Sequence, residues 1–324
     1  MLNFYKNKKV LITGGTGLIG IQLTNILSKY KAKITVVSLE KNNELPKNIK
    51  FIKSDLRYLD NCIKITKNID YVFHLAGIKG SPTMAMEKPY EFMIPMLMFN
   101  TNMIEASRIN KVKKFMFTSS IGVYQPAKIL EEENVWKTFP SKNDWYAGWA
   151  KRIGEISTLA LKIKNKTCVY IVRPANVFGP FDNFNKNNAM VIPSLINKFL
   201  SNEKIEILGD GKNIRDFIYS KDVARAMLFV MYKNYQSPIN IGSGKATSIK
   251  NLVSIINKLI NNKRNIYWKK TVNSGDKIRL MNIKKLQSLG FKFNYSLGEG
   301  LKETIAWYKK NIKNNKRYNA FEEK

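Results

Sequence analysis

The first half of the chain alternates short apolar runs with amphipathic stretches. The apolar runs are rich in β-branched residues and have the length of strands, and they stand at residues 8–13, 33–39, 49–55, 70–76, 113–120 and 167–174. The stretches between them, such as 18–29 and 89–108, have the apolar spacing of one helix face. Strands that alternate with helices in this way build a parallel sheet covered on both faces. The pattern predicts a doubly wound α/β domain.

The pattern becomes less regular after Pro174, where loop-forming residues gather at 178–188 and 208–216. Further helices are predicted at residues 191–200, 221–232, 248–261 and 297–311. The boundaries that we expect are a larger domain over 1–178 with 213–241 returning to it, a smaller C-terminal α/β domain over 179–212 and 242–311, and a tail over 312–324.

The formal net charge of +31 is the extreme value of the composition. The lysines are scattered through every segment and do not gather in a stripe, so we expect attraction for an anionic substrate and no nucleic-acid partner. A polyanion-binding face is the alternative that the charge alone allows. The apolar run 93–99 is too short to span a membrane, and we expect a soluble, cytoplasmic protein. Cys62 and Cys168 lack the spacing of metal ligands, so no metal site is expected.

Three glycines follow the first predicted strand and open the first helix. Gly14 permits a tight turn, Gly17 lets the backbone approach a pyrophosphate, and Gly20 lets helix and strand pack closely. The helix start then presents free N–H groups and the positive end of its dipole to the phosphates. The pattern predicts a dinucleotide site whose other loop contacts come from Thr16, Leu18 and Ile19.

The residue that ends the second strand bears on the choice between NAD and NADP. An acid there would hold the ribose hydroxyls, and by counting the position falls on Ser38, with Glu40 and Lys41 just beyond. A neutral residue beside a lysine tolerates a 2′-phosphate, which favours NADP, whereas Glu40 would serve NAD if the loop curls back. A solvated turn without either role is the third possibility.

The third strand ends in Asp55-Leu56-Arg57 and the fourth in His74-Leu75-Ala76-Gly77. With the glycine motif, these segments resemble the extended short-chain dehydrogenase/reductase family of sugar-nucleotide epimerases and dehydratases. The resemblance implies a Rossmann fold in the larger domain and a substrate domain after it. It implies that Asp55 reaches the adenine and that further cofactor contacts come from Leu56, Leu75, Ala76 and Gly77. His74, the single histidine, is expected to be a packed strand-end residue.

The same resemblance implies a catalytic Ser or Thr after the fifth strand and a Tyr-x-x-x-Lys pair. Ser120, Tyr146 and Lys151 are the matching residues, with Lys151 also a cofactor contact. A lysine ammonium lowers the pKa of a neighbouring phenol so that it can exchange a proton.

Here the pair is five residues apart, which turns the two side chains about 140° from each other on a regular helix. Either a π-type bulge or a helix that begins after Tyr146 would bring them together. Otherwise Tyr146 is an aromatic wall of the pocket.

The stretch RPANVFGPFDNF resembles the family segment whose Asn, here Asn176, faces substrate and cofactor. Its continuation over 182–199 is similar in detail to the GDP-L-fucose synthase branch, which implies a substrate contact from Val191 and favours a GDP-sugar over dTDP- and UDP-sugars. Arg215 matches the arginine that grips the nucleotide diphosphate, and Arg279 is a second candidate. A surface or ion-paired role is the alternative for each arginine.

Two departures from that branch narrow the expected reaction. Gly122 and Met190 stand where its epimerising Cys and His would be, and neither side chain carries a proton at neutral pH. Ile121-Gly122 also replaces the Asp-Glu of dehydratases. Hydride transfer at sugar C4 remains, by a 4-keto reductase, a 4-dehydrogenase or a 4-epimerase.

A dinucleotide-binding sensor or scaffold without catalysis is the alternative. The resemblance also implies a homodimer through helices over 89–108 and 146–162.

Overall fold

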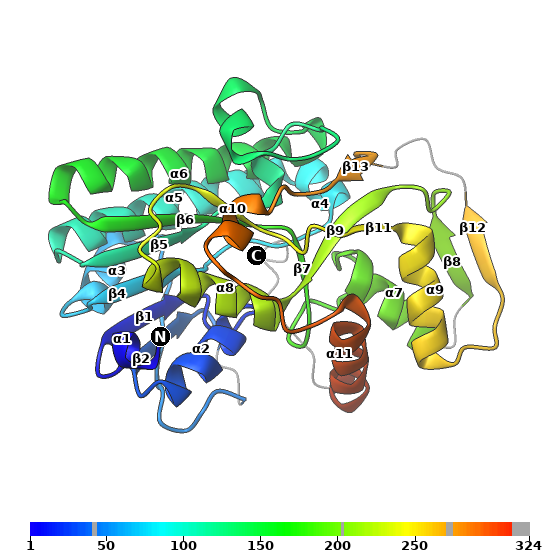
Figure 1. Cartoon of the computed structure of the whole chain (residues 1–324), viewed down its shortest axis with the longest axis horizontal. Helices are drawn as coiled ribbons and strands as arrows, with labels where there is room; N and C mark the ends of the chain where they lie inside the picture. The colour runs from blue at the N-terminus through cyan, green and yellow to red at the C-terminus, as the bar shows by residue number, and fades with distance from the viewer. Residues whose placement is uncertain (41–43, 202–203, 270–274, 313–324) are drawn as a thin grey trace.

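The computed structural model describes residues 1–40, 44–201, 204–269 and 275–312. Its larger body is a seven-stranded, wholly parallel sheet in the order β10-β6-β5-β4-β1-β2-β3 (Figure 1). The strands are β1 (Lys9–Thr13), β2 (Lys33–Ser38), β3 (Lys50–Lys53), β4 (Tyr71–His74), β5 (Lys114–Thr118), β6 (Cys168–Pro174) and β10 (Ile239–Ile241). All six strands predicted in the first half are present, and the predicted α/β fold is confirmed.

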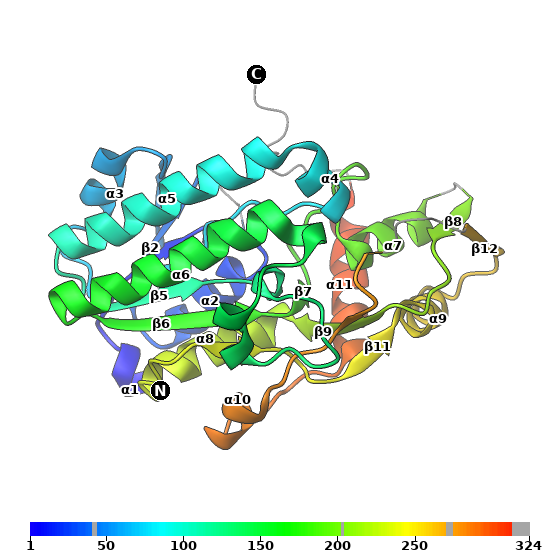
Figure 2. The same ribbon diagram turned by 90° about the horizontal axis from the view of Figure 1, so that it is seen from above.

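Helices cover both faces of this sheet. On one face α3 (Leu59–Thr66), α5 (Pro89–Ile109) and α6 (Trp145–Asn165) pack together, with α5 and α6 side by side (Figures 1 and 2). On the other face lie α2 (Gly20–Lys29) and α8 (Ser220–Tyr232). No helix within the described ranges is long and apolar enough to cross a membrane.

The alternation along the strands decides which face each side chain reaches. In β1, Val10 and Ile12 pack toward α2 and α8, whereas Leu11 packs toward α3, α5 and α6. Because both faces are buried, the strands are almost continuously apolar. β1 neighbours β4 on one side and β2 on the other, and the chain order reverses at this point. A crevice at the carboxyl ends of such strands is where doubly wound folds bind ligands.

A smaller body follows at the carboxyl side of the sheet (Figure 1). Its core is shared by three helices and two small sheets. The helices are α7 (Val191–Leu200), α9 (Ile249–Ile260) and α11 (Leu297–Asn311), and the strands are β7 (Asn176–Phe178), β8 (Ile205–Leu208), β9 (Ile214–Tyr219), β11 (Ala246–Ser248), β12 (Ile266–Lys269) and β13 (Ile278–Arg279).

The segment 213–241, which we expected to return to the larger domain, divides between the two bodies. β9 pairs with β7, β11 and β13 in the small sheet, whereas α8 and β10 lie with the large one. The boundaries themselves stay a prediction. The remaining elements are short, namely α1 (Leu2–Tyr5), α4 (Pro82–Glu87), α10 (Lys284–Ser288) and the 3-10 turns η1 (Ile121–Val123), η2 (Glu132–Lys137) and η3 (Lys142–Asp144).

A fully buried ion pair joins α6 to β6 beneath the crevice. Arg173 Nε and Nη2 donate to the two carboxylate oxygens of Glu155 at 2.8 and 2.6 Å. Ser119 Oγ donates to the same carboxylate at 2.5 Å, and Arg173 Nη1 donates to Tyr124 Oη at 3.1 Å. Because every charged atom has a partner, the pair is tolerated in the core, and removal of one member leaves the other charge uncompensated.

We expect Glu155→Ala to lower the free energy of unfolding by about 3–5 kcal/mol, the usual cost of a broken buried pair. The matched control is Glu105→Ala, which removes a carboxylate from the exposed pair with Arg108 and costs less than about 1 kcal/mol. Guanidinium denaturation measures both. Equal losses in the two variants would contradict the structural role given to Glu155.

Candidate active site

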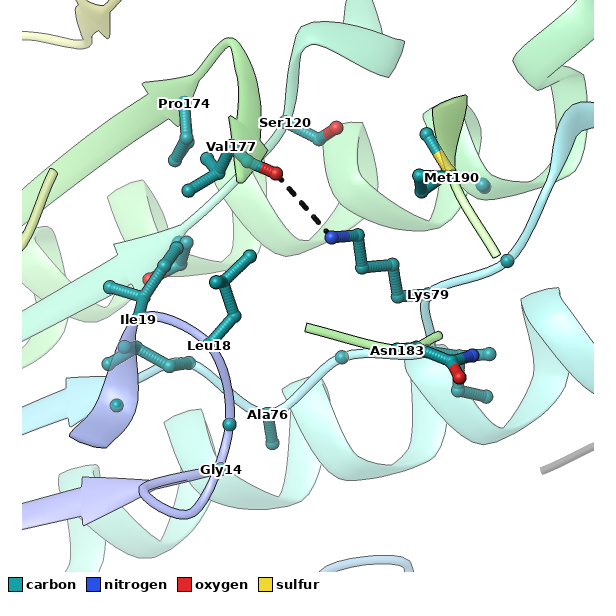
Figure 3. A pocket seen from close by; sticks show the side chains of 18 of the residues that line it. Gly14, Leu18, Ile19, Ala76, Lys79, Ser120, Pro174, Val177, Asn183 and Met190 are labelled. Atoms are coloured by element: carbon teal, nitrogen blue, oxygen red, sulfur yellow. Dashed lines mark hydrogen bonds between the residues drawn. The ribbon is translucent and has the colours of Figure 1, made fainter. Parts of the chain in front are cut away.

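A cavity of about 610 Å³ lies between the two bodies, at the carboxyl ends of the parallel strands. Figure 3 places Gly14, Leu18 and Ile19 of the first strand–helix turn at one end and Lys79, Asn183 and Met190 at the other, with Ser120 and Val177 along one side. All thirteen expected cofactor residues line it: Gly14, Thr16, Gly17, Leu18, Ile19, Gly20, Ser38, Asp55, Leu56, Leu75, Ala76, Gly77 and Lys151. Their individual roles stay predictions.

The glycine turn forms the floor of this cavity by close approach of the backbone. Gly14 has φ +64°, and a Cβ there would lie 2.9 Å from Ala76 N. A Cβ on Gly20 would lie 2.5 Å from Gly14 O. Side chains at these two positions would push the turn away from β4 or from its own helix. The turn is thus shaped for close contact with a ligand, as the glycine spacing predicted.

A chain of buried hydrogen bonds holds the end of β4 against this turn. Ala76 N donates to Thr13 Oγ1 at 3.3 Å, and that hydroxyl lies 2.7 Å from His74 Nδ1. His74 Nε2 donates to Asn100 Oδ1 at 2.9 Å, so Nδ1 is the acceptor of the Thr13 hydroxyl. Burial lowers the pKa of His74 to about 3, with a smaller effect from Lys151, which keeps the ring neutral. The histidine positions the cavity floor from below and is not among the lining residues.

The part of the cavity lined by Asp55 and Arg57, where adenosine is expected, holds an acid paired with an arginine. Asp55 accepts hydrogen bonds from Arg57 Nε at 2.9 Å and Nη2 at 2.7 Å. Burial would raise the pKa of Asp55, but the bonds from Arg57 lower it below its usual value. Ser38 Oγ accepts from Thr16 N at 3.3 Å, and Glu40 also lines the cavity. Lys41, the other residue weighed for NADP, lies outside the described residues.

Ser120 and Lys151 lie where the chemistry is expected. Ser120 follows β5, lines the cavity, and its Oγ accepts from Gly122 N at 3.1 Å. Lys151 is buried, and its Nζ donates to Thr118 O at 2.8 Å and lies 5.2 Å from the centre of the Phe117 ring. Burial lowers the pKa of Lys151 to about 8, against an opposing effect of Glu155.

Tyr146 does not take the position expected for it. α6 is a continuous α-helix from Trp145, so there is neither a bulge between Tyr146 and Lys151 nor a helix start after Tyr146, and both of those expectations were wrong. Ala147, four residues before Lys151, lines the cavity, and Tyr146 is not among the lining residues that are described. It is therefore neither beside Lys151 nor an aromatic wall of this cavity.

Close packing fixes the rotation of α6 in this arrangement. A Cβ on Gly148 would lie 2.5 Å from Gly122 O, and a Cβ on Gly154 would lie 2.2 Å from Phe117 Cζ. Gly148 faces Gly122 of η1 and Gly154 faces Phe117 of β5, and neither contact leaves room for the helix to turn. Lys151 and Ala147 consequently share the side of the helix that faces the cavity.

Sequence analysis missed a lysine and an acid that meet inside the cavity. Lys79 Nζ donates to Val177 O at 3.5 Å (Figure 3). It also donates to Asp182 Oδ1 at 2.5 Å. Asp182 is almost fully buried, and both residues line the cavity. Since the two residues are far apart in the chain, no local pattern could have paired them.

A second cavity of about 310 Å³ opens beside the first on the side of the smaller body. Asn176, Met190, Val191 and Arg279 line both, whereas Arg215 lines only the second. Asn176 Nδ2 donates to Asp216 O at 3.0 Å. The expected substrate residues are thus gathered at the junction of the two cavities, with Ser120 on the side of the first.

The two arginines of the second cavity stand opposite each other on neighbouring strands, in the register Arg279↔Arg215. Arg279 forms ion pairs with Asp276 at 2.6 Å and with Asp144, so the pKa of its guanidinium is raised although burial opposes this. Asp144 and Asp276 were not singled out in the sequence, although Asp276 stands only three residues before Arg279.

Arg215 donates instead to two backbone carbonyls, those of Asp276 at 2.7 Å and Ile214 at 2.8 Å. It forms no ion pair within the described part of the chain, and burial, with the charge of Arg279 beside it, lowers its pKa to about 10. A buried cation next to another cation is stabilised by an anion, so the pair is suited to a bound phosphate group.

A family model of the NAD dependent epimerase/dehydratase family matches residues 10–242, and the chain belongs to this family. The family predicted from the motifs is confirmed. The prediction that the protein is an enzyme of the NAD(P)-dependent nucleotide-sugar epimerase and reductase class is confirmed as well. The prediction that the cofactor is either NAD or NADP is confirmed.

Among curated relatives, the chain is 28% identical to GDP-L-fucose synthase 1 of Arabidopsis thaliana, over 95% of each chain. Among solved structures, it is 29% identical to a UDP-N-acetylglucosamine 4-epimerase from Methanobrevibacter ruminantium M1, with a TM-score of 0.85 over 94% of this chain and 99% of that one. It is 27% identical to MoeE5 in complex with UDP-glucuronic acid and NAD, with a TM-score of 0.81 over 94% and 99% of the two chains.

We expect Gly14→Ala to weaken dinucleotide binding about tenfold or more, because the new methyl group meets Ala76 N in a left-handed turn and such strain costs on the order of 1–3 kcal/mol. Gly290→Ala is the control, since Gly290 also has positive φ but no atom lies within 4 Å of its Cβ position. NADH fluorescence titration measures the affinity of each variant. A comparable loss in the Gly290 variant would assign the effect to general destabilisation.

Proposed function

We propose that this protein transfers a hydride at C4 of a nucleotide sugar, with the sugar diphosphate held by Arg215 and Arg279. The observation that supports this proposal is that the two cavities share lining residues. The glycine turn, Ser120 and Lys151 line the first cavity, Arg215 lines the second, and Arg279 lines both. A dinucleotide and a nucleotide sugar can therefore meet with their reactive ends near Ser120.

The cavity fits an NAD(P) molecule in size, and the turn at Gly14, which has no side chain, lets a ligand approach the backbone closely. The glycine turn would hold the pyrophosphate, Asp55 with Arg57 the adenosine, and Lys151 the nicotinamide ribose. When bound, the nicotinamide ring accepts a hydride from the sugar and can return it. The side chains of the protein bind and orient the two ligands, and they exchange the proton.

The substrate end carries a specific charge argument. Two guanidiniums stand in register, and Arg215 forms no ion pair in the described part of the chain, so its donors suit a bound phosphate group. Nucleotide sugars also appear in the names of the related GDP-L-fucose synthase and of the two structural neighbours with UDP-sugars. We favour a GDP-sugar because the stretch 182–199 that carries the likeness supplies Asn183, Met190 and Val191 to the cavity.

The proposed reaction is limited to hydride transfer by two positions in the lining. Gly122 has no side chain, and its Cβ position lies 3.4 Å from Asp144 Cβ, while Met190 has only a thioether. Neither position supplies an acid or base for epimerisation at C3 or C5. A reductase, a dehydrogenase and a 4-epimerase all fit this limit.

A homodimer through α5 and α6 and a cytoplasmic location are further proposals from the sequence resemblance. The two helices lie side by side, and Ile156 and Ile163 on α6 are exposed by 56% and 85%. A sensor without catalysis was the alternative, and membership of the enzyme family favours catalysis over it.

The function is tested by incubating the purified protein and dinucleotide with GDP-, dTDP- and UDP-sugars. We expect one series to give a change in nicotinamide absorbance or a 4-epimer seen by chromatography. Lys151→Met should abolish this turnover while far-UV circular dichroism stays unchanged, because Lys151 is the buried cation nearest to the Gly77 edge of the cavity. Full activity in Lys151→Met, or no reaction with any series, would refute the proposal.

The diphosphate site is tested by Arg215→Ala, which removes a cation that has no acidic partner among the described residues. We expect the KM for the nucleotide sugar to rise about tenfold or more, since a charge-assisted hydrogen bond contributes on the order of 1.5–3 kcal/mol. NADH affinity should not change. The control is Lys212→Ala, which removes an equal but highly exposed charge three residues away. An unchanged KM in Arg215→Ala would place the diphosphate elsewhere.

A further inference from the structure

We propose that the amine of Lys151 is the group that takes and returns the substrate proton in this protein. The inference rests on the proposed function and names the acid/base of that same site. It assigns to the lysine a step for which the sequence resemblance implied a tyrosine.

The first support is the geometry of α6. Ala147 lies four residues before Lys151, which places the two side chains about 40° apart on one face, and both line the cavity. A methyl group stands at the position from which a phenol would reach between the ammonium and the substrate. Tyr146 cannot rotate into this place because Gly148 and Gly154 pack the helix against Gly122 and Phe117.

The second support is the environment of the Lys151 amine. Of its three donors, one is used by Thr118 O at 2.8 Å, and the Cβ position of Gly77 on the cavity floor is 3.6 Å from Nζ. The nearest ring is the apolar Phe117, and no carboxylate forms an ion pair with Lys151 in the described part of the chain. A desolvated amine without a paired acid can lose its proton near neutral pH. Its pKa of about 8, lowered by burial, agrees with this.

The third support is the state of the other cationic groups that line the cavity. Lys79 is paired with Asp182, Arg57 with Asp55, and Arg279 with Asp144. A group held in an ion pair is a poor proton carrier because either form of the exchange leaves an uncompensated charge. Tyr90 is the one lining phenol among the described residues, and it is 70% exposed at the start of α5. It is therefore included as a variant in the test.

The step balances as follows when the sugar is oxidised. With a dinucleotide bound, the C4–H bond would break as the hydride leaves for it, and the substrate O–H bond would break as its proton passes to the neutral amine of Lys151. A C=O bond forms, and Lys151 becomes an ammonium. In the reverse direction the ammonium returns the proton by the same route.

The direction of the pH dependence follows from this balance. Oxidation needs the neutral amine, so kcat for oxidation should rise with pH through about 8 and then level. Reduction needs the ammonium, so kcat for reduction should fall over the same range. A 4-epimerase uses both forms in turn, and its rate should peak near this value.

The experiment compares Tyr146→Phe, Tyr90→Phe and Lys151→Arg with the unmodified enzyme. Arginine keeps the positive charge but does not release its proton near neutral pH. We expect Lys151→Arg to bind NADH within about threefold of the unmodified protein by fluorescence and to lose at least about 100-fold in kcat. Both phenylalanine variants should keep at least half of the turnover and the same pH profile.

Four results would overturn the inference: a loss of about 100-fold in Tyr146→Phe, a similar loss in Tyr90→Phe, retention of more than a tenth of kcat in Lys151→Arg, or a flat profile between pH 6 and 10 in the unmodified enzyme. If Lys151→Arg does not bind NADH, the pH profile and the two phenylalanine variants decide. Absence of any reaction in the unmodified enzyme would instead refute the proposed function.

Discussion

The fixed rotation of α6 against the large sheet is the constraint on which the site depends. Gly148 and Gly154 allow backbone and ring contacts that no larger side chain would permit, and the buried pair of Glu155 with Arg173 ties the same helix face to β6. Because α6 is held at these three points, it does not rotate about its axis to bring Tyr146 of its first turn toward the cavity. The identity of the residue that faces the cavity is therefore set by its position in the helix, and that residue is Ala147.

The cavity joins two regions with different electrostatics. At the end with the glycine turn, a dinucleotide would meet backbone N–H groups and a positive helix end, and the acid and arginine at Asp55 and Arg57 are already paired. At the proposed sugar-nucleotide end two arginines stand in register, and Asp144 and Asp276 form ion pairs with Arg279, whereas Arg215 forms none among the described residues. Each end is suited to a phosphate-bearing ligand by a different physical means, and Ser120 and Lys151 lie where the two ligands would meet.

Most of the net charge of +31 is carried by residues outside the cavities. Many lysines are exposed and are spread along the chain, whereas the cations that line the cavities are few and are held by specific contacts. Lys79, Arg57 and Arg279 are each fixed by an acid. General attraction for anions and specific recognition are thus carried by different residues.

The amino-acid sequence by itself determined the strands of the large sheet, the helices around it, the glycine turn and the family, because these follow from local periodicity and from motifs within a few residues. It also located Ser120 and Asn176, which follow closely after strands, and Lys151, which the family resemblance singled out. Only the tertiary structure decided that Ala147 faces the cavity in place of Tyr146, that Lys79 meets Asp182, and that Arg215 stands beside Arg279 without an acid of its own. Those outcomes depend on helix rotation and on contacts between distant segments, and packing sets both only after the chain has folded.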